Sequence, residues 1–161
     1  MRLSQNTHDA VRALWAVGAD HGRPPTPTPE VDPWEDEDPL VIPRDEAIVD
    51  FPGTPDISVH LYGDMADTVT IEKYIDFETP RQDTLALVAA LLAGDARRRP
   101  AEGKGLKRLL RELLSAPCGI VLTVPVGGDK AYEQRVPSQC YGLTWVTTLP
   151  EARPAPKPTH R

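Results

Sequence analysis

The chain has 161 residues, 40% of them hydrophobic, and carries a formal net charge of −6 at neutral pH. This length suits one domain with a buried core, and the acidity argues against a general nucleic-acid coat protein and against binding to an anionic membrane surface. Two cysteines are too few for a disulfide-rich secreted scaffold, and no apolar run approaches the roughly 18–20 residues that cross a bilayer.

Composition also bears on compartment and source. The first apolar stretch, residues 10–19, is interrupted by Arg12 and is not followed by a cleavage motif, so we expect no signal peptide. We therefore predict a cytoplasmic protein without a membrane partner. Arginine (13) outnumbers lysine (5), and alanine and proline are plentiful, which is typical of bacteria with GC-rich genomes.

Residues 1–22 are expected to form an N-terminal helix. Over residues 7–19, four residues recur at helical spacing on one face: Val11, Leu14, Trp15 and Gly18. Asp9 falls in the first turn, where the helix dipole favours a negative charge. Because so short a helix is marginal alone in water, Trp15 should bury against the main domain or against another protein.

Residues 23–44 change character and predict a proline-rich, acidic linker or arm. Seven prolines between positions 24 and 43 disfavour helix and central strand and favour an extended path. Trp34, followed by Glu35 and Asp36, is a candidate anchor for another protein. An equally supported alternative folds Trp34 and the apolar residues 40–42 back over the protein's own sheet.

Residues 45–150 are expected to form a single domain that begins with strands. A short strand over 47–51 ends at a Pro-Gly turn, and two alternating segments then follow at 56–62 and 68–77. The alternation requires an odd number of loop residues, and 63–67 supplies five. This register places Val59 opposite Ile71 and His60 opposite Thr70, with Lys73 as the one misfit on the inner row.

Two helices are predicted next. Thr79 should cap the first, with Pro80 at its first position, Gln82 completing a capping box and Gly94 ending it. Its apolar stripe comprises Leu85, Val88, Ala89, Leu91 and Leu92. After a basic connection over 97–105, five leucines between 106 and 114 predict the second helix, which Pro117 stops.

The remainder predicts three strands and a tail. A nearly continuous apolar run over 118–126 indicates a buried strand, a Gly-Gly-Asp turn leads to a strand over 132–136, and a last strand is expected over 141–148. Residues 151–161 are expected to be disordered. The predicted fold is therefore α+β, with an antiparallel sheet of about five or six strands and two main helices packed on one face.

The sequence carries none of the common reaction motifs. The phosphate-binding loop, the dinucleotide-binding glycine motif, the His-Glu-x-x-His zinc motif and the Gly-x-Ser-x-Gly nucleophile motif are all missing from it. A thiol enzyme would need a base such as His60 beside Cys118 or Cys140, and nothing in the sequence brings them together. Buried cysteine is ordinarily an inert small apolar residue.

A metal site finds little support either. His60, Tyr62 and Asp64 alternate on one predicted strand, with Glu72 expected diagonally across from His60. This supplies the start of a site but not the three or four ligands that a metal centre needs. We therefore predict neither a metal nor another cofactor, and no catalytic residue is assigned.

Interaction surfaces are the remaining candidates. Beyond the arm, they comprise the polar face of the hairpin (His60, Tyr62, Glu72 and Tyr74) and a basic segment that includes Arg97, Arg98, Arg108 and Arg111. The basic charges either meet phosphate or coat the outer side of a leucine-faced helix. The acidity of the rest of the chain favours the second interpretation over a nucleic-acid partner.

The hypothesis we favour is a non-catalytic bacterial protein-binding module, of the adaptor or immunity (inhibitor) type, that acts through the acidic arm and the sheet surface. Its partner would be another protein, and a homo-oligomer stays open. Two alternatives also stay open: a small enzyme or ligand-binding domain that uses the polar hairpin face, and a nucleic-acid accessory protein that uses the basic segment 97–111.

Overall fold

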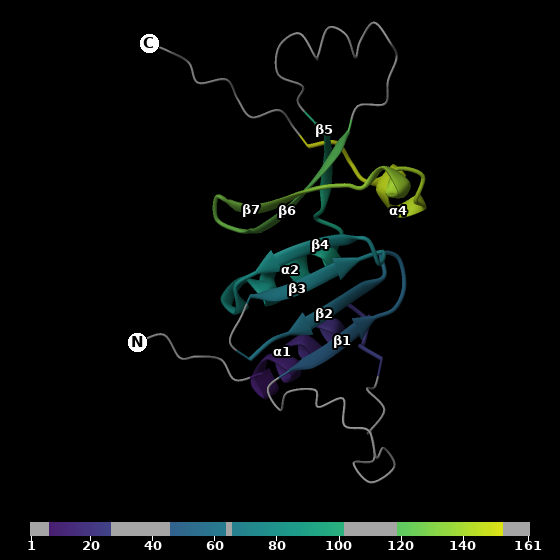
Figure 1. The fold of residues 1–161 in the computed structure, drawn as a ribbon. Coiled ribbons are helices and arrows are strands. Elements are labelled where there is room, and N and C mark those ends of the chain that lie inside the picture. Colours follow the sequence, from purple (N-terminus) through teal and green to yellow (C-terminus); the bar gives the residue numbers. More distant parts are fainter. Residues whose placement is uncertain (1–6, 27–45, 64–65, 102–118, 153–161) are drawn as a thin grey trace, which may run out of the picture.

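The computed structural model describes residues 7–26, 46–63, 66–101 and 119–152. Their strands form two antiparallel sheets, one of four strands and one of three, and helices pack beside them (Figure 1). This confirms the α+β class. The prediction of one sheet with five or six strands is wrong, because the last three strands pair with one another in a sheet of their own.

The larger sheet is a meander of β1 (Ala47–Phe51), β2 (Ile57–Leu61), β3 (Asp67–Ile71) and β4 (Ile75–Thr79), in that order. The short strand at 47–51 and the inward alternation of the hairpin are confirmed. The predicted register is two residues off, because the five-residue connection is 62–66 and sets Val59 opposite Val69 and His60 opposite Thr68. Both registers have an odd number of loop residues and keep the same side chains on the inner face, so only packing distinguishes them.

The segment 68–77 is two strands, not the one predicted. The chain reverses at Glu72 and Lys73, whose φ angles of 52° and 68° are the two positive values of a type I′ hairpin turn. The Tyr74 N–H donates to the Ile71 carbonyl at 3.2 Å and closes the turn. Lys73 breaks the inner row because it sits in this turn. The sequence hid the turn, since type I′ positions usually hold Asn, Asp or Gly.

Helix α1 (Thr7–Asp20) confirms the N-terminal prediction, including Asp9 in its first turn. Its buried residues are Ala10, Leu14 and Gly18, so the inward face is rotated from the predicted stripe. Trp15 lies at the border of that face and remains 38% exposed, so it is not buried against the main domain, and its burial against another protein stays a prediction. Gly18 is required by close approach, because a Cβ there would lie 2.6 Å from the Arg23 carbonyl oxygen.

Helix α2 (Arg81–Ala93) ends as predicted, with Gly94 in the left-handed conformation at φ 78°. The predicted capping box is wrong, because Thr79 is the last residue of β4 and Pro80 occupies the cap position without a side-chain bond. The helix buries Thr84, Leu87, Val88, Ala90 and Leu91, whereas Leu85, Ala89 and Leu92 of the predicted stripe are only partly buried, so the buried face is rotated from the prediction. This face is set by its neighbours, because the helix contacts α1, the larger sheet and β6 together.

The smaller sheet has the order β5 (Arg97–Pro100), β6 (Ile120–Gly127) and β7 (Lys130–Arg135). The strands at 118–126 and 132–136 are confirmed within a few residues, as is the Gly-Gly-Asp turn. The basic connection was misjudged, since Arg97–Pro100 is a strand that pairs with β6. The second predicted helix, 106–114, lies outside the described residues.

The C-terminal strand predicted at 141–148 is wrong. The chain instead forms a 3-10 turn, η1 (Ser138–Cys140), and a short helix, α4 (Thr144–Thr148). Trp145 and Val146 are both buried although they are adjacent, which one face of a strand cannot provide. Residues 150–152, assigned in part to the tail, run beside β5, where the Ala152 N–H donates to the Arg98 carbonyl at 2.8 Å.

Helices α1 and α2 cover one face of the larger sheet, and β6 packs on α2 from the side of the smaller sheet (Figure 1). One apolar core joins these layers. Its fully buried members include Leu14 of α1, Phe51, Val59 and Ile71 of the larger sheet, Leu87 and Val88 of α2, and Leu122 and Val124 of β6. The opposite face of the larger sheet therefore stays free of these helices.

Candidate functional site: the open face of the larger sheet and its edge

Two rows of side chains cross all four strands on the uncovered face of the larger sheet. The strand registers place them as Asp50, Ser58, Thr70 and Asp76 in one row, and Ile48, His60, Thr68 and Glu78 in the other. Neither row contains lysine or arginine. We call these eight residues the acidic face, because acids stand at both ends of one row and at one end of the other.

His60, a candidate from the sequence, lies between Ile48 and Thr68 in the second row of the acidic face. Its Nε2 lies 3.1 Å from a carboxylate oxygen of Glu46, and its ring stacks on Tyr62 with centroids 3.9 Å apart. Both contacts hold the imidazole against the surface of the sheet. The exposed Ile48, directly opposite His60 on β1, adds the apolar element at this end of the row.

Glu72 and Tyr74 do not join His60 and Tyr62. Glu72 lies in the β3–β4 turn, where its carboxylate accepts a hydrogen bond from the Asp56 N–H at 3.1 Å. Tyr74 follows it and is 54% exposed. The predicted diagonal between His60 and Glu72 required His60 to lie opposite Thr70, but His60 lies opposite Thr68 and Glu72 falls in the turn beyond the end of β3.

A buried ion pair anchors the start of β3 to the start of α2. Arg81 donates from Nε to Asp67 Oδ2 at 2.7 Å and from Nη2 to Oδ1 at 2.8 Å, and Nη2 also bonds the Tyr62 carbonyl. Thr84 donates to the same carboxylate at 2.7 Å. Asp67 is fully buried, and a fourth bond, donated by the Tyr62 N–H at 3.3 Å, completes the charge pairing and hydrogen bonding of its carboxylate. The cluster is a structural support that also fixes the backbone at Tyr62.

A groove separates β4 from β7 at the border of the acidic face. It encloses about 370 Å³ and is lined by three residues of each strand: Asp76, Phe77, Glu78, Tyr132, Glu133 and Gln134. Figure 1 shows the β6–β7 hairpin lying along the β4 side of the larger sheet. We refer to these six residues as the β4–β7 groove. Sequence reasoning missed it, since it depends on how the two sheets meet.

Asp83 of α2 holds the smaller sheet beside the groove. Its Oδ2 accepts a hydrogen bond from the Tyr132 hydroxyl at 2.6 Å and pairs with Lys130. The bond from Lys130, and then that from Tyr132, lower the pKa of Asp83 below its ordinary value of 3.8. Burial, followed by the bond to Asp83, raises the pKa of Tyr132 above its ordinary value. At neutral pH Asp83 and Lys130 therefore stay charged while the Tyr132 hydroxyl keeps its proton, and the three groups tie β7 to α2.

The arginines of β5 lie on both sides of the smaller sheet. Arg99 forms a two-bond ion pair with Glu133, at 3.2 and 2.8 Å, and this pairing lowers the pKa of Glu133. Arg97 donates to the backbone carbonyls of Gly94 and Ala96. Arg108 and Arg111 lie outside the described residues. Among the described residues of the basic segment, the charge of Arg99 is therefore neutralised by Glu133.

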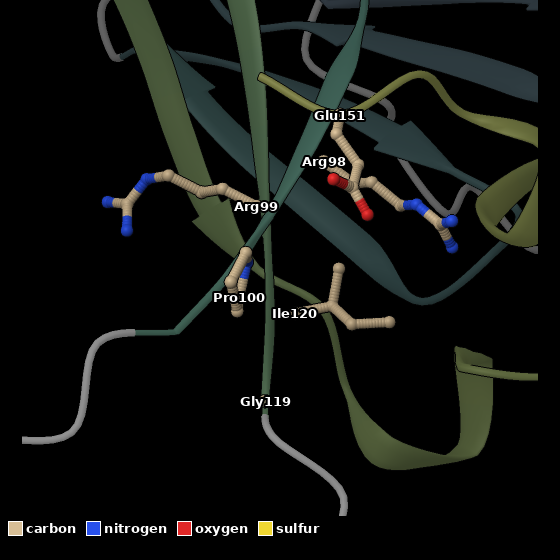
Figure 2. A pocket seen from close by; sticks show the side chains of 6 residues that line it. All are labelled: Arg98, Arg99, Pro100, Gly119, Ile120 and Glu151. Carbon is tan, nitrogen blue, oxygen red and sulfur yellow. The ribbon is translucent and has the colours of Figure 1, made fainter. Parts of the chain in front are cut away.

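A second hollow, of about 250 Å³, lies at the outer end of β5. Figure 2 shows Arg98 and Glu151 on one side of the strand and Arg99 on the other. Among the described residues, neither the Arg98 guanidinium nor the Glu151 carboxylate has a side-chain partner.

The thiol hypothesis receives no geometric support from Cys140. This residue is the last of η1 and is fully buried, and burial, with a smaller contribution from the Glu72 charge, raises the pKa of its thiol. A raised pKa leaves less thiolate, which is the reactive form. Cys118 lies outside the described residues.

Other predicted sites can be placed only in part. Within the described ranges, no group of three or more His, Cys, Asp and Glu side chains is arranged to hold a metal ion. None of the described helices has the length and apolar character needed to span a bilayer. Trp34, Glu35 and Asp36 of the arm lie outside the described residues.

Comparisons with protein-family models, with curated proteins and with solved structures find no match for this chain.

Proposed function

We propose that this chain is a non-catalytic protein-binding module, of the adaptor or inhibitor type, that uses the acidic face as its interaction surface. The observation that carries the proposal is the composition of the two rows. Asp50, Asp76 and Glu78 have no cation beside them in the rows, whereas the opposite face of the sheet is occupied by α1 and α2. Such a face favours a partner with a basic surface, because complementary charge steers association and penalises acidic competitors.

The apolar and aromatic elements of the face support the same proposal. Ile48 is 48% exposed, and the His60–Tyr62 stack lies on the neighbouring strand. Protein interfaces combine a small apolar or aromatic centre with a polar rim. The arrangement offers an anchor at the β1 side and charge toward β4.

Quantitative affinity enrichment tests the proposal. A face variant, Asp50→Lys with Thr68→Lys, is compared with the wild type in lysate of the source cells. A matched control carries the same charge change on the helix side, as Asp95→Lys with Ala19→Lys, both at exposed positions. We expect at least one protein to be recovered by the wild type and the control and to fall severalfold with the face variant. Equal recovery by all three, or recovery of the chain alone, contradicts the proposal.

A nucleic-acid role is the second candidate, favoured by one observation. Arg99 and Arg135 align across Val121 on the same face of the smaller sheet, and Arg97 lies two residues from Arg99 on that face. Binding to phosphates would weaken steeply with salt. Fluorescence anisotropy with labelled single- and double-stranded oligonucleotides tests this role. The titrations are run at several salt concentrations between about 50 and 200 mM, a range over which binding through phosphate contacts weakens strongly. No binding at the lowest salt removes it.

A further inference from the structure

The β4–β7 groove lies between two unpaired strand edges. β4 is the last strand of the larger sheet and β7 the last of the smaller one, and the two strands approach without pairing. An unpaired edge presents a row of backbone donors and acceptors to any extended chain. The groove thus offers a backbone template, as well as side chains, over its middle three residues on each strand.

The registers identify which backbone groups face the groove. Successive residues of an antiparallel strand direct their N–H and C=O groups to alternate sides. The Asp50 carbonyl points away from β2, since it accepts a bond from the Thr26 N–H at 2.8 Å. The registers place Asp50 opposite Ser58, Ser58 opposite Thr70, and Thr70 opposite Asp76. Because Asp50 and Ser58 point their backbone groups away from each other, Ser58 and Thr70 point theirs toward each other, and Thr70 and Asp76 again point theirs away. The backbone groups of Asp76, and of Glu78 two residues later, therefore face the free edge of β4.

The same reasoning applies to β7. The Val136 N–H donates to the Ile120 carbonyl at 2.9 Å, so the backbone groups of Gln134 and Tyr132 also point toward β6. Those of Glu133 then point away from β6. The outward-facing backbone groups of both strands therefore coincide with the acidic residues that line the groove.

The unpaired negative charge of the groove favours a positively charged segment. Glu133 is already neutralised by Arg99, whereas Asp76 accepts only the Thr70 hydroxyl at 2.7 Å and Glu78 has no side-chain partner among the described residues. Both acids are exposed on β4, two residues apart. Side chains two residues apart on a strand lie on one face, about 6.6 Å from each other.

We propose that the β4–β7 groove binds an extended segment of a partner protein that pairs with the edge of β4 and carries two basic residues at alternate positions. Such a segment has the same side-chain period as β4, so its two cations lie over Asp76 and Glu78. The segment would extend the larger sheet by one strand, a recognised mode of peptide capture. This inference rests on the proposed function and specifies the chemistry of its partner.

Two synthetic peptides of equal composition test the inference on the full-length protein. One carries two lysines separated by a single threonine, and the other carries the two lysines in succession. We expect the alternating peptide to bind at least fivefold more tightly in isothermal titration, because only its spacing matches the two acids. Equal affinity for both peptides, or no binding of either, overturns the inference.

Backbone pairing has its own readout. Hydrogen exchange should slow at the amides of Asp76 and Glu78 when the alternating peptide binds, and N-methylation of the peptide residues that face β4 should abolish both the protection and the binding. A peptide that binds without protecting these amides lies elsewhere, and the inference is then wrong.

A protein variant and a control complete the experiment. Asp76→Asn with Glu78→Gln should lower the affinity for the alternating peptide at least fivefold, while Asp20→Asn with Asp95→Asn, an equal charge change at exposed positions near the helices, should leave it unchanged. If the Asp50→Lys and Thr68→Lys variant loses a partner while the peptides fail to bind, the proposed function stands and this inference alone is lost. If the peptide saturates only against a second copy of the chain, the groove is a self-association site and the inference is overturned.

Discussion

Single residues carry strain and charge that the alternation of the sequence does not reveal. The clearest example is the β3–β4 turn, where Glu72 and Lys73 both adopt positive φ. For a residue with a Cβ, this conformation costs roughly 1 kcal/mol or more. The turn persists because β3 and β4 pair on both sides of it and bury Ile71 and Ile75.

This strain predicts a stabilising substitution. Lys73→Gly should raise the free energy of unfolding by about 0.5 kcal/mol, since the relief of the left-handed conformation exceeds the entropy that glycine adds to the unfolded chain. Urea unfolding followed by circular dichroism measures it. Glu78→Gly, in the extended conformation of β4, is the control and should lower stability by about 0.5–1 kcal/mol. A loss of stability in Lys73→Gly would contradict the turn assignment.

Asp83 predicts a pH dependence. Its pKa is lowered by Lys130 and then by Tyr132, so its contribution to stability is present above the pKa of the unfolded chain and is lost as pH falls through the lower, folded value. Wild type should therefore melt at a higher temperature than Asp83→Asn near neutral pH, and the difference should shrink as pH falls below the ordinary value of 3.8 and through the lower, folded pKa. Thermal melts from pH 7 to pH 2 measure this. A difference that is constant over that range would mean that Asp83 acts through packing alone.

At the scale of elements, a short polar cluster decides how α2 attaches to the larger sheet. Asp67 begins β3, Arg81 begins α2, and Thr79 and Thr84 share a hydrogen bond of 3.1 Å between the end of β4 and the first turns of the helix. Four polar groups thus join three elements at one buried point. They also explain why Thr79, predicted as a cap, is used within the core.

Removal of the buried carboxylate should be costly. Asp67→Ala leaves Arg81, which is 17% exposed, without its counter-charge, and we expect a loss of about 3 kcal/mol in the free energy of unfolding. Asp76→Ala, which removes an exposed acid from the neighbouring strand, should change it by less than about 0.5 kcal/mol. Chemical denaturation of both variants makes the comparison. Similar small effects for the two would show that the Asp67 pair contributes nothing net.

At the scale of the whole molecule, the two sheets share a core through α2. Leu122 and Val124 of β6 are fully buried with Leu87 and Val88 of the helix in one cluster. Because the helix has a sheet on one side and β6 on another, loss of one layer exposes the next. The β4–β7 groove exists for the same reason, since it marks where the edges of the two sheets meet.

This shared core predicts cooperative unfolding. Leu122→Ala should lower the free energy of unfolding by about 3 kcal/mol, and hydrogen exchange should accelerate together at amides of β2 and of β6. Acceleration confined to β5, β6 and β7 would instead show that the smaller sheet unfolds as a separate unit. The two patterns are directly distinguishable by mass spectrometry of peptides from each sheet.

Much of the local structure follows from the sequence because it depends on neighbours in the chain. The period-two pattern of 57–61, the helical spacing in α1 and Gly94 at the end of α2 each reflect contacts within a few residues. The misplaced elements are those with long-range partners. Arg97–Pro100 becomes a strand because β6 offers it an edge, and Tyr141–Thr148 does not, because its adjacent Trp145 and Val146 both turn to the core.

The candidate site divides in the same way. His60 and Tyr62 could be paired from sequence, since two residues of one strand share a face whatever the strand packs against. The groove between Asp76 and Glu133 could not, because 57 positions separate these residues and no local pattern states which edges of two sheets will meet. Alternation is a property of one strand, whereas the neighbour of its free edge is decided by how the apolar faces of several elements bury one another.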